Sequence, residues 1–528
     1  MRCGKQELYG LVDAPDESLQ SNMGGGDPAV AGDFTVSAGI GDGEGVFLPL
    51  LDDLGWRLNH PDADGCVVFL GFALRREGGG GKYPCVTPAL EDLFSFLRFA
   101  SISTDSRHAG DVRACADWLV GKLSGMGLAT ALHETPKHPV VIARNAHVAG
   151  RRTVLIYGHY DVQPVDPLHL WTSDPFQPEI RCGKIWARGA TDNKGQMMAH
   201  VLGVEKTLRE NAELPVNLIF LFEGEEEIGS PNLAPFLLQH REEIRCDVIA
   251  ISDTGMVAPG VPTLGYGLRG VTCCEAILRG PKGDLHSGLF GGAVANPAAA
   301  VARLVASLHA SDGRVAIDGF YDSVRSLEDW ERQMWSRVPG VSDADFLQVT
   351  GSPGMFGEPG YSSAERVWSR PTAEINGIGG GYQGEGSKTV IPAEAFVKLS
   401  FRLVPDQSPE DIMKKVEAHL VRNCPQGVEI EVIVGHEGKP YITDPNSAFG
   451  LAGQAALRAA FNAEPVLIRE GGSIPIVQTF REILGADSLL LGLALADAQI
   501  HAPNENFPVE NFEAGIRLNQ ALLVELAK

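Results

Sequence analysis

Apolar segments and helical patterns alternate along the chain from residue 88 to residue 252. Apolar side chains recur with helical spacing over 90–97, 112–123 and 197–204, and a further helix is expected over 233–239. Between them lie short, β-branched runs that are typical of buried strands, at 140–143, 153–158, 216–222 and 246–252. Strands that alternate with helices in this way predict an α/β domain with a mostly parallel central sheet.

A different pattern extends from about residue 264 to residue 437. The segments 265–280 and 395–404 alternate apolar and polar residues, as strands with one covered face do, and 428–434 is a further predicted strand. Amphipathic helices are expected over 296–308 and 412–421. Two β-α-β passages of this kind predict a four-stranded α+β domain. Patterns of the first type resume near Tyr441, so the second domain is expected to be inserted into the first.

Residues 1–84 differ from both domains. They contain glycine runs at 24–26 and 78–81, and only 66–74 has the composition of a strand. Because the rest lacks sustained periodicity, we expect a poorly ordered N-terminal extension that carries no chemistry.

The charge and hydrophobicity of the chain exclude some classes of binding partner. The chain has 44 Lys and Arg against 67 Asp and Glu, a net charge of −23, which argues against nucleic acid or an anionic membrane. Apolar runs fall short of the ~20 residues of a membrane span, and the first twenty residues lack the apolar core of a signal peptide, so a cytoplasmic location is expected. Nine cysteines without a CxxC motif favour reduced, buried thiols over disulfides or a cysteine metal site.

Acidic and imidazole side chains follow the predicted strands of the first domain, where ligands of a parallel sheet bind. They are His159, Asp161, Asp192, Glu226, Glu227, Asp253 and His501. Histidines and carboxylates without cysteine suit Zn²⁺, Mn²⁺ or Co²⁺, and two such ions can polarise a carbonyl and lower the pKa of a bridging water. Of the adjacent Glu226 and Glu227, one could ligate while the other moves protons, and Asp161 would orient His159.

Each feature has an ordinary structural explanation when taken alone. An acidic run such as 223–227 is usually a solvated loop, and single histidines such as His286 and His501 are more often surface or structural residues. The combination changes this interpretation, because several acidic residues at the ends of separate strands in one α/β domain are improbable without a functional role. A non-catalytic dimeric binding protein with the same fold would be expected to lack ligands, and none is missing.

Nine short motifs resemble those of the dinuclear metallo-exopeptidase family of carnosinases, cytosolic non-specific dipeptidases, aminoacylases and succinyl-diaminopimelate desuccinylases. The dipeptidase branch is the most similar. The motifs, in family order, are YGHYDVQP (157–164), WTSDPFQP (171–178), ARGATDNKGQ (187–196), FEGEEEIGS (222–230), DLHSGLFGG (284–292), SKTVIP (387–392), FRLVP (401–405), REGGSIP (469–475) and HAPNEN (501–506).

The resemblance implies a zinc-exopeptidase-like catalytic domain in two parts, 85–264 and 438–528, with an inserted α+β (ferredoxin-like) lid and dimerisation domain at 265–437. It implies that one metal ion is held by His159, Asp192 and Asp253, and the other by Asp192, Glu227 and His501, with Asp192 bridging. Glu226 would be the general base that takes a proton from the bridging water and passes it to the leaving amine, and Asp161 would support His159. The Asp192–Asn193 peptide bond would be cis. The family often has Asp at position 193, and Asn here should not remove a ligand.

Further residues implied by the resemblance serve the substrate. His286 would reach into the partner subunit's active site in a homodimer and stabilise the oxyanion, and Arg402 would bind the terminal carboxylate, with Thr389 and Ser473 as further contacts. We therefore expect metal-dependent hydrolysis of dipeptides or short peptides with two ions per subunit, zinc foremost and otherwise Mn²⁺ or Co²⁺. The alternative is an amidohydrolase that acts on N-acyl amino acids with the same site.

Overall fold

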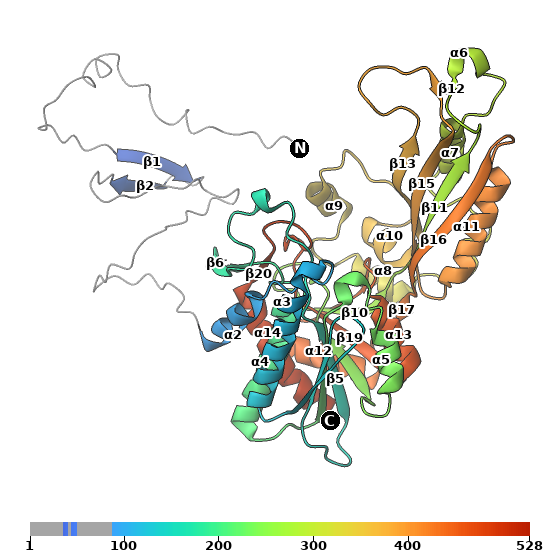
Figure 1. Cartoon of the computed structure of the whole chain (residues 1–528). Helices are drawn as coiled ribbons and strands as arrows, with labels where there is room; N and C mark the ends of the chain where they lie inside the picture. The colour runs from blue at the N-terminus through green and yellow to red at the C-terminus, as the bar shows by residue number, and fades with distance from the viewer. Residues whose placement is uncertain (1–34, 41–43, 50–86) are drawn as a thin grey trace, which may run out of the picture. The chain divides into compact units, whose positions relative to one another are not determined.

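The computed structural model describes residues 35–40, 44–49 and 87–528 (Figure 1). The chain divides into two compact units, Met1–Tyr83 and Pro84–Lys528. In the first unit, strands β1 (Thr35–Ile40) and β2 (Glu44–Pro49) pair in antiparallel register, a pair that the sequence pattern does not predict. The strand predicted at 66–74 lies outside the described residues.

A nine-stranded mixed sheet forms the centre of the second unit. Its strand order is β17-β10-β19-β9-β5-β8-β4-β3, with β18 beside β10. The strands are β3 (Ala129–His133), β4 (Val140–Arg144), β5 (Thr153–His159), β8 (Asn217–Glu223), β9 (Val248–Ile251), β10 (Thr263–Leu268), β17 (Tyr441–Ile442), β18 (Val466–Glu470) and β19 (Asp487–Gly492). The four middle strands β19, β9, β5 and β8 run parallel, whereas β4 and β3 are antiparallel at one margin. The predicted α/β fold with a parallel sheet centre is confirmed.

Helices cover both faces of this sheet. Alternate residues of β5 show this, because Val154 and Ile156 pack in one apolar core while Leu155 and Tyr157 pack in another. The first core also contains residues of α2 (Pro88–Leu97), α3 (Ala109–Gly125), α4 (Lys194–Asn211), α12 (Ala448–Phe461) and α14 (Val509–Leu526). The second core contains residues of α5 (Leu233–Gln239) and α13 (Pro475–Leu484). Burial on both faces explains why the middle strands are continuously apolar.

A second, four-stranded antiparallel sheet is built from β13 (Thr372–Gly380), β15 (Glu394–Leu403), β11 (Gly270–Arg279) and β16 (Glu429–Gly438), in that order. Helices α7 (Pro297–Ser307) and α11 (Pro409–Asn423) pack on one face, which buries Val397, Leu399 and Phe401 of β15. The predicted strand 265–280 is two strands, because β10 belongs to the large sheet and β11 to the small one.

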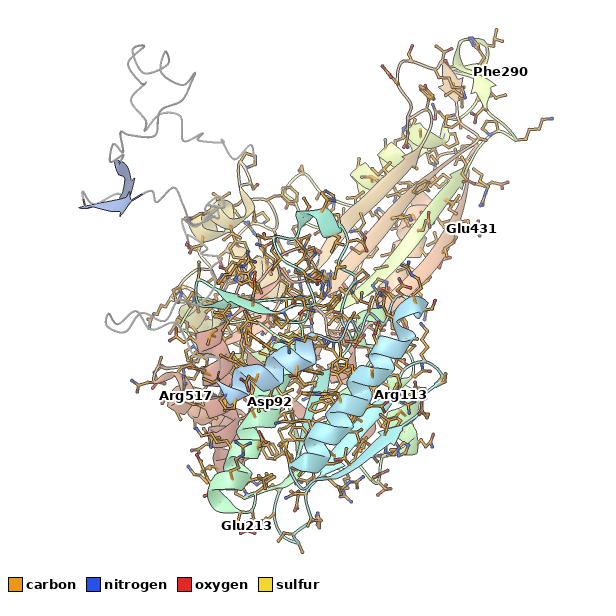
Figure 2. The ribbon with its side chains drawn as sticks, turned by 60° about the vertical axis from the view of Figure 1, so that its left-hand side comes forward. Asp92, Arg113, Glu213, Phe290, Glu431 and Arg517 are labelled. Carbon is orange, nitrogen blue, oxygen red and sulfur yellow. The ribbon has the colours of Figure 1, made fainter. Side chains whose placement is uncertain are left out.

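At the far end of the small sheet, β12 (Leu285–His286) pairs antiparallel with β14 (Val390–Ile391), and α6 (Ser287–Phe290) directly follows β12 in the chain. Figure 2 shows Phe290 at this tip, well away from Asp92 and Arg113 on the helices of the large sheet. Helices α8 (Asp329–Trp335), α9 (Asp343–Thr350) and α10 (Ser363–Ser369) lie along the chain between the two strands β11 and β13. A three-stranded sheet joins β6 (Glu179–Arg181), β7 (Lys184–Trp186) and β20 (Asn506–Pro508).

The cysteines bear out the prediction of reduced thiols only in part. Free thiols are carried by Cys115, Cys246, Cys273, Cys274 and Cys424. Cys182 is disulfide-bonded, so the prediction is wrong at that position. Across the described residues, every helix is too short or too polar to cross a membrane.

Candidate metal centre and active site

The carboxyl ends of the parallel strands bring the predicted acids and imidazoles together. His159 is the last residue of β5 and pairs in register with Glu223, the last residue of β8. Asp253 follows the neighbouring strand β9, and Asp192 lies two residues before α4 begins. The Asp192–Asn193 peptide bond is cis, as the family resemblance implies. The loop before β20 supplies His501, whose backbone has a φ of 61°.

Two groups of side chains have the spacing of metal ligands. His159, Asp192 and Asp253 form one group, and Asp192, Glu227 and His501 form the other, with the ligand atoms of each group within 4.8 Å of one another. Asp192 belongs to both, because its Oδ1 lies 3.1 Å from Nε2 of His159 and its Oδ2 lies 2.9 Å from Nε2 of His501. A single carboxylate therefore faces both groups with a different oxygen.

The donor atoms of these groups fit divalent cations. Nε2 of His159 and Oε1 of Glu227 are buried and have no hydrogen-bond partner, which is costly for a polar atom that binds nothing. Nε2 of His159 also faces Oδ2 of Asp253 at 3.7 Å, and Nε2 of His501 faces Oε2 of Glu227 at 3.3 Å. Imidazole and carboxylate donors without thiolate are the set that suits Zn²⁺, Mn²⁺ or Co²⁺.

The proximity of these groups shifts their pKa values strongly. Burial disfavours charge on His159, but the surrounding carboxylates of Asp161, Asp192 and Asp253 prevail and raise its pKa well above the usual range. Hydrogen bonds that the protonated imidazole donates to Asp192 and Glu227 raise the pKa of His501 to about 10. Burial raises the pKa of Glu226 well above normal, with added repulsion from Asp253, Asp192 and Glu227. A cluster of this kind is typical of a functional site.

Asp161 contacts His159, Glu226 and Glu227 and holds them in position. It is fully buried, and its Oδ1 lies 3.4 Å from Nδ1 of His159. Its two oxygens also accept the backbone N–H groups of Glu226 at 3.3 Å and Glu227 at 3.1 Å. Glu226 and Glu227 begin a turn of 3₁₀ helix (Glu226–Ile228) and do not lie in an extended segment. Asp161 thus fixes His159 and both glutamates at once.

Two amide side chains hold neighbouring carboxylates. Gln163 donates from Nε2 to Oε2 of Glu227 at 2.8 Å, and Asn193 donates from Nδ2 to Oδ1 of Asp253 at 2.9 Å. Asn193 therefore bonds to the side chain of a predicted ligand, Asp253. Sequence reasoning missed Gln163, although it lies in the first motif, because a neutral amide beside a strand end carries no metal signal.

The acidic run at 223–227 is not a solvated loop. Glu223 is buried and accepts hydrogen bonds from the hydroxyls of Tyr157 at 2.7 Å and Ser230 at 2.8 Å. Glu225 is buried and accepts the backbone N–H of His138 at 2.8 Å. These two residues stabilise the turn, whereas Glu226 and Glu227 face the cluster.

The predicted substrate contacts separate into two pairs. Arg402, on β15, donates from Nη1 to Oγ of Ser473 at 2.9 Å, and Ser473 lines the cavity beside the metal groups. His286 and Thr389 are exposed and adjacent, because the N–H of Ser287 donates to the carbonyl of Thr389. Strand β12, which ends at His286, lies at the far tip of the small sheet, away from β5, which ends at His159 (Figure 1). Within one chain, Ser473, bonded to Arg402, lies beside the metal groups, whereas the pair His286 and Thr389 does not.

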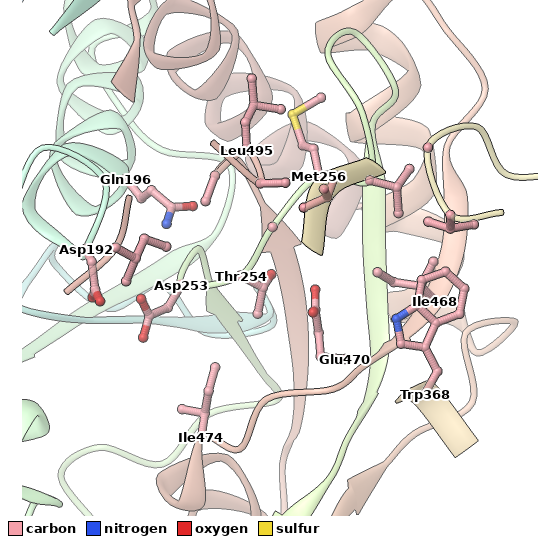
Figure 3. Close-up of a pocket in the computed structure, with 18 of the residues that line it drawn as sticks. Asp192, Gln196, Asp253, Thr254, Met256, Trp368, Ile468, Glu470, Ile474 and Leu495 are labelled. Carbon is pink, nitrogen blue, oxygen red and sulfur yellow. The ribbon is translucent and has the colours of Figure 1, made fainter. Parts of the chain in front are cut away.

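A cavity of about 490 Å³ opens beside the two groups. Asp192, Glu226, Asp253 and His501 line one side of it. Figure 3 shows Asp192 and Asp253 at this side and Trp368 and Ile468 at the other, with Glu470 between them. The cavity gives a peptide-sized ligand access to the predicted ligands and to Glu226.

Comparison with known proteins agrees with this geometry. The model of peptidase family M20/M25/M40 matches residues 155–525. The chain is 34% identical over 394 residues to the Cys-Gly metallodipeptidase DUG1 of Saccharomyces cerevisiae, covering 73% of this chain and 81% of the relative. It is 32% identical over 400 residues to the human Beta-Ala-His dipeptidase, covering 74% and 78%.

A solved structure shows the same architecture. The M20 family metallo-carboxypeptidase Sso-CP2 of Sulfolobus solfataricus superimposes with a TM-score of 0.75 and 32% identity, over 84% of this chain and 99% of that chain. The family resemblance seen in the nine motifs is thereby confirmed. On the match of the family model and of these relatives, the chain belongs to peptidase family M20/M25/M40.

Proposed function

We propose that this chain is a metallopeptidase that hydrolyses the peptide bond of dipeptides or short peptides with two divalent cations. The observation that carries the proposal is the position of Asp192, whose two oxygens face His159 and His501 respectively. A carboxylate shared by two ligand groups is the arrangement that a dinuclear centre requires. The names of the dipeptidase relatives support the choice of substrate.

His159, Asp192 and Asp253 would hold one ion, and Asp192, Glu227 and His501 the other. Zinc is the ion that we favour, because catalytic zinc sites commonly take three imidazole or carboxylate ligands from the protein, the number that each group supplies. When bound, the two ions would polarise the scissile carbonyl and acidify the attacking water. Gln163 and Asn193 would keep the carboxylates of Glu227 and Asp253 in orientation through their hydrogen bonds.

Glu226 is the proposed general base. Glu226 lines the cavity. The carboxylates of Glu223 and Glu225, in contrast, accept hydrogen bonds from Tyr157 and from the backbone of His138 and are held in place by them. Asp161 accepts its backbone N–H and so sets the position of its carboxylate. Burial raises the pKa of Glu226, which favours holding a proton taken from water until the leaving amine accepts it.

Two subunits would complete the site. Arg402, held on Ser473, would bind the terminal carboxylate of the substrate. His286 and Thr389 lie too far from the metal groups of their own chain to act there, so we propose that they serve a partner subunit in a homodimer, with 265–437 as the lid and dimerisation domain. Leu289 and Phe290, close to His286 in the chain, are 76% and 42% exposed. Exposed apolar side chains of this kind are typical of a surface that binds another protein subunit.

Removal of the metal tests this function. Dialysis against a chelator should abolish hydrolysis of dipeptides, and added Zn²⁺, Mn²⁺ or Co²⁺ should restore it. Parallel assays with N-acyl amino acids test the alternative amidohydrolase. Activity that survives complete removal of metal, or hydrolysis of N-acyl amino acids alone, would contradict the proposal. The cytoplasmic location expected from the sequence stays a prediction.

A further inference from the structure

We propose that a second cavity, the arginine cavity lined by Arg269, Arg366, Arg370 and Arg402 at the base of the small sheet, binds an oxyanion between Arg269 and Arg402. The oxyanion is either the side-chain carboxylate of an acidic carboxyl-terminal residue of the substrate or a separate small anion, and the experiment below separates these sources. The first source rests on the proposed peptidase function and would make the enzyme selective for peptides that end in Asp or Glu.

The arginine cavity has a volume of about 320 Å³ and carries more basic than acidic side chains. The basic residues are Arg269, His309, Arg366, Arg370 and Arg402, and the acidic ones are Glu358 and Glu374. Glu358 is already paired, because it accepts Nε and Nη2 of Arg370 at 2.7 and 2.8 Å. Among the residues that the structure describes, no carboxylate forms an ion pair with Arg269, Arg366 or Arg402. The wall therefore has an excess of positive charge, although the chain as a whole has a net charge of −23.

Arg402 and Thr372 lie opposite each other on neighbouring strands of the small sheet. They pair in register between β15 and β13, which places their Cβ atoms about 5 Å apart. The adjacent pair, Phe401 and Ala373, belongs to the core under helices α7 and α11, so Arg402 and Thr372 point to the other face. Oγ1 of Thr372 lines the arginine cavity and is buried without a hydrogen-bond partner. An oxyanion that accepts hydrogen bonds from this hydroxyl and from Arg402 would satisfy both.

Arg269 brings a second guanidinium group to this place. It lies directly before β11, and its Nε donates to the carbonyl of Gly471 at 2.8 Å, whereas its Nη1 and Nη2 donate to no other group in the described part of the chain. Burial lowers the pKa of Arg269 to about 10, the positive charge of Arg402 adds to this effect, and Glu374 opposes it. A bound oxyanion would stabilise both charges, because guanidinium groups bind carboxylate-like anions with two parallel hydrogen bonds.

The arginine cavity adjoins the active site through residues 470–473. Arg402 donates from Nη1 to Oγ of Ser473, and Ser473 lines the cavity beside the metal groups. Arg269 bonds to Gly471 in the same segment. A peptide whose terminal carboxylate is bound at Arg402 would therefore have the side chain of its last residue close to Arg269. An acidic side chain would pair with Arg269, whereas its amide analogue would leave that charge unpaired.

The test compares Arg269→Gln with the unaltered enzyme, both loaded with Zn²⁺. The substrates are Ala-Glu and Ala-Asp, each with its neutral amide analogue, Ala-Gln and Ala-Asn. If the anion is a substrate side chain, the substitution lowers the ratio of kcat/KM for an acidic substrate over its analogue about 10-fold to 100-fold, the range of a hydrogen bond to a charged group. If the anion is separate, calorimetric titration with sodium sulfate shows binding to the unaltered enzyme that Arg269→Gln weakens about 10-fold or more, and the ratio stays the same.

An unchanged ratio, together with sulfate binding that is absent or equal in the two proteins, would overturn the inference. Arg517→Gln is the matched control, because Arg517 is exposed on α14 and likewise donates from Nε to a backbone carbonyl, that of Ala460. Should Arg269→Gln fail to fold, Thr372→Val removes the unpartnered hydroxyl at nearly constant shape and should lower the same ratio or the same sulfate affinity by a smaller factor, and no change in either would overturn the inference as well. Failure of the peptidase function itself is recognised separately, because the unaltered enzyme would then hydrolyse none of the four substrates while the sulfate titration still tests the site.

Discussion

The carboxylate of Glu505 accepts the backbone N–H of Asp192 at 2.9 Å. The same oxygen, Oε1, accepts the N–H of Thr191 at 2.8 Å, while Oε2 accepts the N–H of Gly189 at 3.0 Å and Nη1 of Arg188 at 2.8 Å. Glu505 and Arg188 are almost completely buried. Since Glu505 lies four residues after His501, it ties the loop of one predicted ligand to the loop of another.

Glu505→Gln should therefore weaken both the fold and the metal site. A glutamine leaves Arg188 buried without a charged partner and offers one acceptor oxygen in place of two, and loss of one member of a buried ion pair costs about 3–5 kcal/mol. Denaturant unfolding measures this cost, and mass spectrometry measures the metal retained per folded chain. Glu525→Gln, at a solvent-facing pair with Lys528, is the control. Unchanged stability together with unchanged metal content would contradict the role of Glu505.

Glu226→Gln and Glu227→Gln should both lose activity, but only Glu227→Gln should also lose metal. Glu226→Gln removes the proposed base and should keep both metal ions, with a loss of about 10²–10⁴ in kcat. Glu227→Gln removes a proposed ligand whose Oε2 faces His501, so metal content should fall with activity. Metal quantification and steady-state kinetics on the same preparations separate the two. Near-full activity of Glu226→Gln with two bound ions would show that another group is the base.

Hybrid dimers test whether His286 acts across subunits. A mixture of Glu226→Gln and His286→Ala chains can form dimers with one intact site, since one chain supplies Glu226 and the other His286. With random pairing, activity should approach about a quarter of that of the unaltered enzyme, because half of the dimers each hold one intact site. The two variants measured separately give the baseline. Activity of the mixture that does not exceed this baseline would rule out a shared site.

His200 should make stability depend on pH below neutrality. It is buried, hydrogen-bonded to Asn519 and to Oγ of Ser252, and burial lowers its pKa to about 4. The unfolded state then binds a proton near pH 6.5 while the folded state stays neutral, so the free energy of unfolding falls between pH 6.5 and pH 4, by about 3 kcal/mol.

The measurement compares metal-free protein with its His200→Gln variant, so that loss of metal does not contribute to the pH dependence. The variant should lack this part of the slope and keep the remainder. Identical slopes for the two proteins over pH 4–6.5 would show that His200 does not titrate in this way.

Much of the large sheet could be predicted, because a strand that is buried on both faces is a continuous run of apolar, β-branched residues. The runs at 153–158, 216–222 and 246–252 are β5, β8 and β9 with their bounds shifted by at most two residues. The sequence pattern does not predict strand β18. Its last two residues, Arg469 and Glu470, are followed by Gly471 and Gly472, and these four residues have the composition of a turn. Its pairing with β10 depends on a contact across about 200 residues of chain, which periodicity does not encode.

The chemistry of the site was predictable where a residue type is rare in its context. A histidine or an acid directly after a buried strand is such a signal, and the structure brings His159, Asp192, Asp253, Glu227 and His501 together. Gln163 and Glu505 were missed because they act through hydrogen bonds to ligands or to their loops, and such bonds leave no composition signal. Glu470 lies in the motif REGGSIP, and only the structure shows that one of its oxygens is buried at the cavity without a hydrogen-bond partner.

Anomalous diffraction at the zinc absorption edge, from crystals grown with Zn²⁺, tests the dinuclear centre most directly. Two peaks per chain are expected, one against each oxygen of Asp192, with His159 and Asp253 beside the first and Glu227 and His501 beside the second. A single peak, or two peaks that do not share Asp192, would contradict the central claim.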